Sequence, residues 1–333
     1  MVMQFADLHL HSSYSRATSK NITLDEMARN ARLKGLDILG TGDFTHPVWI
    51  KELRKDLSDE RGIYDYDNIK FILTGEISLV YTQGGKGRRI HYVLLAPDFS
   101  TVDQINAFLD KKGRRDYDGR PIFGFSSIEL VDVMMSISKD IMVIPAHAWT
   151  PWFGIFGSMS GFDSLKECFQ EKAKYIHAIE TGMSSDPSMN WRLSALDDVA
   201  LVSFSDAHSL YPHRLGREAT VFDLKEINYK NIVNAIKNKE ILFTVETSPS
   251  YGKYHFDGHR NCNFSCSPDE SKNLRNICPK CSTKMTIGVL NRVEELADRP
   301  EGFRPKDAPD FKSLVPLTEL IALQYGQAVF SKK

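Results

Sequence analysis

Short apolar runs alternate with helix-like segments along most of the chain, as far as about residue 245. Runs rich in Val, Ile, Leu, Phe and Tyr that are bounded by Gly, Pro, Asp or Ser are typical of buried strands. We predict strands at residues 5–9, 37–42, 71–76, 90–96, 141–145, 175–180, 201–205 and 241–245.

The segments between these runs have the pattern of helices, at residues 23–34, 128–138, 165–174 and 229–238. The first is the clearest, because "TLDE" places Glu26 three residues after Thr23, which is the spacing of a capping box. Alternating strands and helices favour an α/β fold with a mainly parallel sheet, and we expect that sheet to close as a barrel.

The character of the chain changes after residue 248, where Gly, Tyr, His and Pro become frequent and a cysteine cluster follows. Beyond the cysteines, "GVLNRVEELADRPEG" has the pattern of one helix, and a proline-punctuated loop leads to a last apolar stretch. We therefore divide the chain into a barrel (1–248), a four-cysteine zinc-binding module (249–286) and a helical C-terminal segment (287–333).

The composition is that of an ordinary globular protein, with 333 residues that are 42% hydrophobic and 26% charged. A formal charge of -1 gives no global signal for nucleic acid. No apolar run approaches the length of a membrane span, and the first residues read as a strand rather than as a leader peptide. We expect a cytoplasmic protein that has no membrane partner.

Metal-capable side chains recur where the predicted strands end, and catalytic groups gather at the carboxyl ends of strands in parallel α/β folds. Seven predicted strands end in or carry them: Asp7, His9 and His11; Asp43 and His46; Glu76; His91; His147; Glu180; and Asp206 and His208. A single histidine beside a strand is more often structural. A structural role does not explain why metal-capable side chains recur at the same level of seven predicted strands. Divalent cations would offset the cost of burying so many ionisable groups together.

The first pair shows how such a site would form. His9 and His11 are two residues apart, so in a strand they point to the same face and can hold one ion. Nitrogen and oxygen ligands together suit Zn²⁺, Mn²⁺ or Fe²⁺. Clustered divalent ions suit hydrolysis of a phosphate ester, because they activate a water and stabilise the attacking and leaving oxygens.

The cysteines form a second candidate site. C-x₃-C and C-x₂-C pairs would supply four thiolates to one structural zinc ion, from Cys262, Cys266, Cys278 and Cys281. The module is either a staple for a segment with little core of its own or a surface that faces nucleic acid. The second interpretation draws on four basic residues in or beside it: Lys272, Arg275, Lys280 and Lys284. We expect the remaining cysteine, Cys168, to be buried packing.

The motifs "HLH", "TGDFTH" and "SDAH", with the isolated acid and histidines between them, resemble the PHP (polymerase and histidinol phosphatase) superfamily. The resemblance implies a distorted (β/α)₇ barrel with two or three divalent ions, Zn²⁺, Mn²⁺ or Mg²⁺. It implies a first ion on His9, His11, Glu76 and Asp206, and a third on Glu76, His91 and His147. His208, with Asp43 and His46, would belong to the second. Phe44 stands where the superfamily pattern has a histidine, and His46 is the candidate to replace it.

Longer phrases, "HLHSSYSRATSK", "SSDPSMNWRLSALD" and "SDAHSLYPHRLGREAT", resemble the endonuclease Q family of PHP nucleases. This implies a nick on the 5′ side of uracil, hypoxanthine, xanthine or an abasic site in DNA, with Asp206, Glu76 and His147 as catalytic residues. Asp206 would be both a ligand and a proton acceptor. Damaged DNA is the implied partner, and a sliding clamp is a further candidate through a C-terminal region that follows in related proteins.

Candidate DNA contacts lie near the first motif and after His147. We predict phosphate contacts from Ser12, Arg16, Lys20 and Arg192. The aromatic stretch "HAWTPWFGIFG", with Trp149 and Trp152, would be either a stacking loop or core. Two alternatives remain open, a small-molecule phosphatase of the same superfamily and a non-catalytic DNA-binding protein on a decayed barrel.

Overall fold

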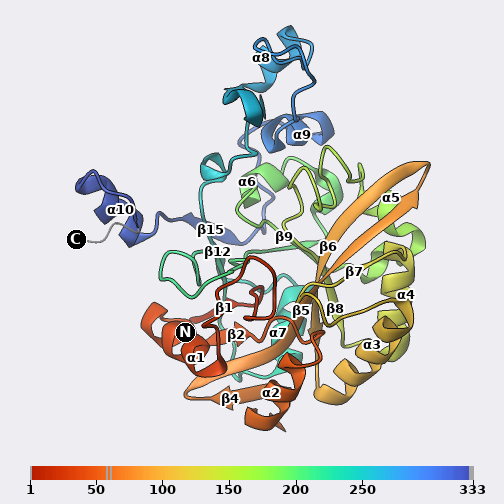
Figure 1. Ribbon diagram of the computed structural model, residues 1–333, viewed down its shortest axis with the longest axis vertical. Coiled ribbons are helices and arrows are strands. Elements are labelled where there is room, and N and C mark those ends of the chain that lie inside the picture. The colour runs from red at the N-terminus through yellow and green to blue at the C-terminus, as the bar shows by residue number, and fades with distance from the viewer. Residues whose placement is uncertain (1, 58, 61, 330–333) are drawn as a thin grey trace.

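The computed structural model describes residues 2–57, 59–60 and 62–329. Its centre is a curled, mixed sheet with helices packed on the outside, and a smaller module projects at the top of Figure 1. Within the ranges that the structure describes, no helix is both long and apolar enough to cross a membrane.

The sheet is built around five strands of the barrel. β1 (Gln4–Asp7), β2 (Ile38–Gly40) and β5 (Ile69–Gln83) run parallel. β6 (Lys86–Ala96) returns antiparallel from β5, and β8 (Met142–Pro145) is antiparallel to β6. The expected α/β architecture is confirmed, but the sheet is mixed rather than mainly parallel, because β5 and β6 form one long hairpin.

Two further strands complete the ring beside β8. β9 (Ala178–Glu180) and β10 (Ala200–Val202) form a parallel pair. The Ala148 N–H donates to the carbonyl of the last residue of β9 (2.9 Å), and the His11 N–H donates to the Ala207 carbonyl (3.1 Å). Backbone bonds beyond the strand ends therefore link β8 to β9 and the end of β10 to β1, which gives a distorted barrel.

The other strands extend this sheet or form the small module. β11 (Ala219–Phe222) pairs antiparallel with β1, β12 (Phe243–Glu246) pairs antiparallel with β11, and β15 (Asp310–Ser313) pairs parallel with β12. The remaining strands are short: β3 (Asp59–Glu60), β4 (Ile63–Tyr66), β7 (Ile122–Phe123), β13 (Asp257–His259) and β14 (Phe264–Cys266). β15 falls in the stretch that the sequence pattern assigns to a loop, because its polar residues gain strand structure only from pairing with β12.

Helices cover the outside of the sheet: α1 (Leu24–Lys34), α2 (Trp49–Asp56), α3 (Phe99–Lys112), α4 (Ser127–Ile137), α5 (Leu165–Phe169), α6 (Pro187–Asn190) and α7 (Tyr229–Lys237). α1 begins at Thr23, whose side chain accepts the Glu26 N–H, and ends at Gly35 in the left-handed region (φ 83°). It buries Met27 and Ala31 against the sheet, as its spacing predicts.

The C-terminal part of the chain returns to the barrel. α8 (Pro268–Asn273) lies in the projecting module, and α9 (Val289–Leu296) connects that module to the barrel. Arg292 of α9 is buried, and its guanidinium donates to the carbonyls of Phe156 (3.0 Å) and Phe162 (3.2 Å). α10 (Leu317–Gln324) lies apart at the left of Figure 1 with exposed leucines.

Candidate metal centre

Two groups of metal-capable side chains meet at one mouth of the barrel and share Glu76. The first contains His9, His11, Glu76 and Asp206, and the second contains Glu76, His91 and His147. Within each group the candidate ligand atoms lie within 4.8 Å of one another. Residues from five separate parts of the chain therefore converge on adjoining positions for two cations.

The candidate ligand atoms of the first group converge on one position. His11 Nε2 lies 3.1 Å from Glu76 Oε2 and 3.1 Å from Asp206 Oδ1. His9 Nε2 lies 3.4 Å and 3.6 Å from the same two oxygens, and it is buried without a hydrogen-bond partner. A buried nitrogen that faces two carboxylates without a hydrogen bond fits a divalent cation between them.

The second group has the same character. His91 Nδ1 lies 2.8 Å from Glu76 Oε1, and His147 Nε2 lies 3.4 Å from that oxygen. The two imidazole nitrogens are 3.2 Å apart. Burial lowers the pKa of His91 to about 4, so this ring is neutral at physiological pH and can act as a ligand.

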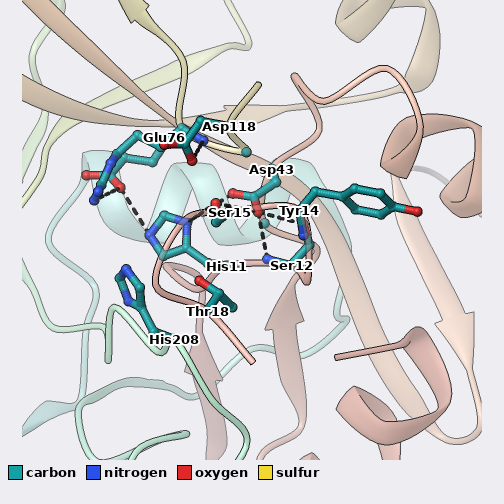
Figure 2. Close-up of polar contacts among 12 residues, drawn as sticks. His11, Ser12, Tyr14, Ser15, Thr18, Asp43, Glu76, Asp118 and His208 are labelled. Carbon is teal, nitrogen blue, oxygen red and sulfur yellow. Dashed lines mark hydrogen bonds and ion pairs between the residues drawn. The ribbon is translucent and has the colours of Figure 1, made fainter. Parts of the chain in front are cut away.

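In His9, His147 and His11, the ring nitrogen that does not face the ligand group contacts another residue. His9 Nδ1 contacts Glu180 Oε1 (2.8 Å), and His147 Nδ1 contacts Thr150 Oγ1 (2.9 Å). His11 Nδ1 contacts Asp43 Oδ1 at 3.0 Å, on the side of the ring opposite Glu76 in Figure 2. Such partners orient the imidazole and increase its basicity as a metal ligand.

The electrostatics of the first group favour charged carboxylates. Burial lowers the pKa of His9, but Glu180, Glu76 and Asp206 outweigh burial and hold it well above its usual value. Burial likewise raises the pKa of Glu76, but Arg120 and the histidines outweigh it and hold that pKa well below normal. Glu76 is therefore ionised and available to two cations.

Backbone strain and one buried carboxylate shape the mouth. Asp43 (φ 46°), His147 (φ 30°) and Asp206 (φ 48°) all lie in the left-handed region, which non-glycine residues rarely adopt. Asp7 Oδ1 accepts the Ser205 N–H (3.0 Å), next to Asp206, and its other oxygen accepts the Gly216 N–H. Asp7 thus ties the loop that carries Asp206 to β1.

Three predicted ligands fall outside both groups. Asp43 is turned away from the mouth, because its Oδ2 accepts the Ser12 N–H (2.7 Å) and the hydroxyls of Ser12 and Ser15. His46 stacks on Tyr14 with ring centroids 4.4 Å apart. His208 lies against the His11 ring (4.4 Å). Among the described residues, the second ion of the superfamily pattern therefore has no assembled ligand set, and Asp43 positions His11 instead.

Replacing Asp43 by Ala should therefore weaken the site without removing a ligand. We expect a loss of activity of roughly 10- to 100-fold, because His11 would lose the group that orients its ring. Metal-dependent nicking and metal content of the purified variant would be measured together. Asp103→Ala, which removes a surface carboxylate paired with Arg54, is the control. Unchanged activity in Asp43→Ala would contradict the positioning role.

Two further residues at the site have roles that the sequence interpretation does not assign. Arg120 Nη1 lies 3.1 Å from Glu76 Oε2, and no motif marks it because it follows a polar loop. Glu180 ends a strand and was noted as metal-capable, but its oxygens hold His9 and the His147 N–H (2.6 Å). Glu76 does not end its strand as predicted, since the hairpin of β5 and β6 continues past the barrel, whereas His91 lies within β6 as expected.

The predicted DNA contacts divide into exposed and buried residues. Arg16 (side chain 70% exposed) and Lys20 are exposed at the surface, where Arg16 pairs with Asp118 and Lys20 donates to the Ser13 carbonyl (2.9 Å). Ser12 is buried and bonds to Asp43. Trp149 is fully buried, donates to Asn190 Oδ1 (2.8 Å) and packs in the core, which is one of the two roles that the sequence leaves open for it. Arg192 is partly buried, and its backbone carbonyl accepts the N–H groups that follow α9.

The cysteine module gathers three of its four predicted ligands. Cys262, Cys278 and Cys281 lie together with His259, and their ligand atoms are within 4.8 Å of one another. Cys266 is outside this group, buried with Cys278 and Met285 in a small apolar cluster. The signal that could have found His259 is its spacing, since H-x₂-C matches the C-x₂-C of the other pair.

Two cavities open beside Asp206. One of about 430 Å³ is lined largely by rings and short loops: His91, His147, Trp152, Phe153, Phe204 and Tyr254. We call it the aromatic cavity. The other, of about 560 Å³, contains His208, Ser209, Arg214 and the backbone near Thr18. Asp206 and Arg217 line both.

A mixed α/β barrel that gathers these histidines and carboxylates at its mouth is the architecture of a metal-dependent hydrolase. The crystal structure of the lesion-specific endonuclease Q of Pyrococcus furiosus matches 99% of this chain and 80% of its own, with a TM-score of 0.87 and 34% identity. Endonuclease Q in complex with a duplex carrying an abasic lesion at the active site matches with a TM-score of 0.89, 35% identity and 81% of its length. The chain belongs to the endonuclease Q family.

Curated relatives carry no described activity. An uncharacterised protein of Methanocaldococcus jannaschii is 36% identical over 191 residues, and the matched region spans only 23% of that protein's length. An uncharacterised protein of Bacillus subtilis is 26% identical over 336 residues, across 94% of this chain and 81% of that protein. No model of a known protein family matches the chain.

Proposed function

We propose that the chain is a metal-dependent endonuclease that nicks DNA on the 5′ side of a deaminated base or an abasic site. One observation carries the proposal: the two-cation cluster opens directly into the aromatic cavity. A base flipped out of the duplex needs such a cavity beside the groups that act on its phosphodiester. The related endonuclease Q bound to an abasic duplex supports the same substrate class.

The residues have distinct roles in this proposal. His9, His11, Glu76 and Asp206 would hold one divalent ion, and Glu76 with His91 and His147 the other. Such ions, when bound, make a water nucleophilic near neutral pH and stabilise the oxygens of an in-line displacement. Asp206 is the most exposed carboxylate of the cluster, with 30% of its side chain accessible, so it can accept a proton from the attacking water.

Arg120 has a separate role in this scheme. Its Nη1 contacts Glu76 Oε2, and a quarter of its side chain is accessible. A guanidinium at this position can contact a phosphate oxygen while it keeps Glu76 ionised. A sliding clamp as a partner stays a prediction of the sequence.

The function is tested by incubating the protein and divalent ions with otherwise identical duplexes that carry uracil, hypoxanthine, xanthine, an abasic site or no lesion. We expect a nick immediately 5′ of the lesion that leaves 3′-hydroxyl and 5′-phosphate ends, and no cut in the undamaged duplex. Turnover of nitrophenyl phosphate without nicking would instead favour a small-molecule phosphatase. Binding to lesions without cleavage under any metal condition would favour a non-catalytic DNA-binding protein.

Trp152 should contribute to the nicking of substrates whose lesion still carries a base. It lines the aromatic cavity and contacts Tyr254 edge to face, with ring centroids 5.7 Å apart. Trp152→Ala should reduce nicking at uracil or hypoxanthine about tenfold, because base stacking contributes roughly 1–3 kcal/mol. The effect should be much smaller at an abasic site, which has no base to stack. Tyr251→Ala, an exposed aromatic outside the cavity, is the control, and equal losses on both substrates would contradict the stacking role.

A further inference from the structure

The second cavity beside Asp206 differs in chemistry from the aromatic one. Beside Ala17 and Tyr211, its lining carries hydroxyl, imidazole and guanidinium groups from Thr18, Ser19, His208, Ser209, Arg214 and Arg217. Asp206 is the only carboxylate in that lining, and it belongs to the metal cluster. We call this space the arginine cavity. Its hydrogen-bond donors and positive charge suit a phosphate group rather than a base.

The two arginines keep donors available. Arg217 donates once, from Nη2 to the Ser205 carbonyl (3.2 Å), and its Nε is buried without a hydrogen-bond partner. Arg214 has an exposed side chain, and within the part of the chain that the structure describes no ion pair engages it. Arg120, by contrast, is already paired with Glu76.

The backbone beneath these side chains is well anchored. The N–H groups of Arg214 and Leu215 both donate to the Tyr211 carbonyl (2.8 and 3.1 Å), and Leu215 is buried. Gly216 lies between the two arginines in the sequence, and its N–H donates to the Asp7 carboxylate of β1 (2.9 Å). On the opposite wall the Ser19 N–H donates to the His208 carbonyl (3.0 Å). The arginines thus project from a turn that is tied to the barrel.

The relative positions of the cavities set the direction of a bound strand. We propose that the arginine cavity binds the phosphate next to the cut on its 5′ side, in the strand that keeps the new 3′-hydroxyl, with Arg214 and Arg217 as its ligands. This inference rests on the proposed function. If the lesion occupies the aromatic cavity and the phosphate 5′ of it lies at the cations, the chain must continue past Asp206 and Arg217. These two residues border both cavities, and the arginine cavity is the space beyond them.

The test neutralises one phosphate at a time. Uracil duplexes carry a single methylphosphonate at successive positions on either side of the scissile bond, and binding is measured without divalent ions by fluorescence anisotropy. On unmodified DNA, Arg214→Gln should weaken binding about tenfold, since one charged hydrogen bond to the phosphate is lost. On DNA with the methylphosphonate one position 5′ of the scissile phosphate, wild type and Arg214→Gln should bind equally. Arg217→Lys should show the same position dependence with a smaller loss.

Arg29→Gln removes an exposed arginine of α1 that pairs with Glu26, and it should bind every duplex like the wild type. The proposal is overturned if the difference in affinity between wild type and Arg214→Gln disappears when a phosphate 3′ of the lesion is neutralised. It is also overturned if neutralising no single phosphate removes that difference. Failure of the proposed function would look different, because the wild-type protein itself would not nick the uracil duplex.

Discussion

Asp206→Asn should abolish nicking while leaving binding to lesion-containing DNA almost unchanged. Asn preserves the shape of the side chain but removes its negative charge and its capacity to accept a proton. Asp206 Oδ1 lies 3.1 Å from His11 Nε2 and 3.6 Å from His9 Nε2, so the same change also weakens one ligand of the first cation. We expect the single-turnover rate to fall about a thousandfold or more, in the upper range for loss of a general base.

The measurement compares single-turnover nicking, DNA affinity and metal content in the same preparations. Asp198→Asn, which changes an exposed carboxylate in the connection between β9 and β10, is the matched control and should behave as the wild type. If Asp206→Asn kept a tenth of the wild-type rate, Asp206 would be neither proton acceptor nor ligand. Equal loss of binding and nicking would indicate instead that the substitution disrupts the structure of the barrel mouth.

His259→Ala should abolish binding of the zinc ion that the sequence predicts for the module, whereas Cys266→Ser should retain it. The first removes a member of the ligand group, and the second changes a buried thiol outside it. The small apolar cluster of Cys266, Cys278 and Met285 is too little core to hold the module alone. A structural zinc contributes about 10–16 kcal/mol in zinc-finger peptides, so its loss should unfold residues 249–286.

Zinc per protein chain and hydrogen exchange across the module are the two measurements. In His259→Ala we expect the stoichiometry to fall by one zinc and exchange to rise in the module but not in the barrel. Cys278→Ser should match His259→Ala. Zinc loss in Cys266→Ser with retention in His259→Ala would restore the four-cysteine site that the sequence predicts.

The sequence predicted most of what depends on local pattern. The strands that carry Asp7 and Glu76, and the strand that leads to Asp206, are predictable because buried strands need uninterrupted apolar runs. The ends of α1 followed from a capping side chain and a left-handed glycine, which act within one turn. The long β5–β6 hairpin was missed as a unit, because its outer half has too many polar residues to read as a strand without its partner.

The sequence determined which residues could be ligands. Imidazole and carboxylate groups recur at the ends of predicted strands, and the cysteines occur in closely spaced pairs. Which of them are ligands was decided only in three dimensions. Asp43 and Cys266 have the right chemistry, but hydrogen bonds hold the first and burial the second away from the clusters. His259, the last residue of β13, and Arg120, in a loop, reach their sites through packing between distant segments. Local sequence sets a side chain's chemistry, whereas its direction depends on the neighbours that the folded chain brings to it.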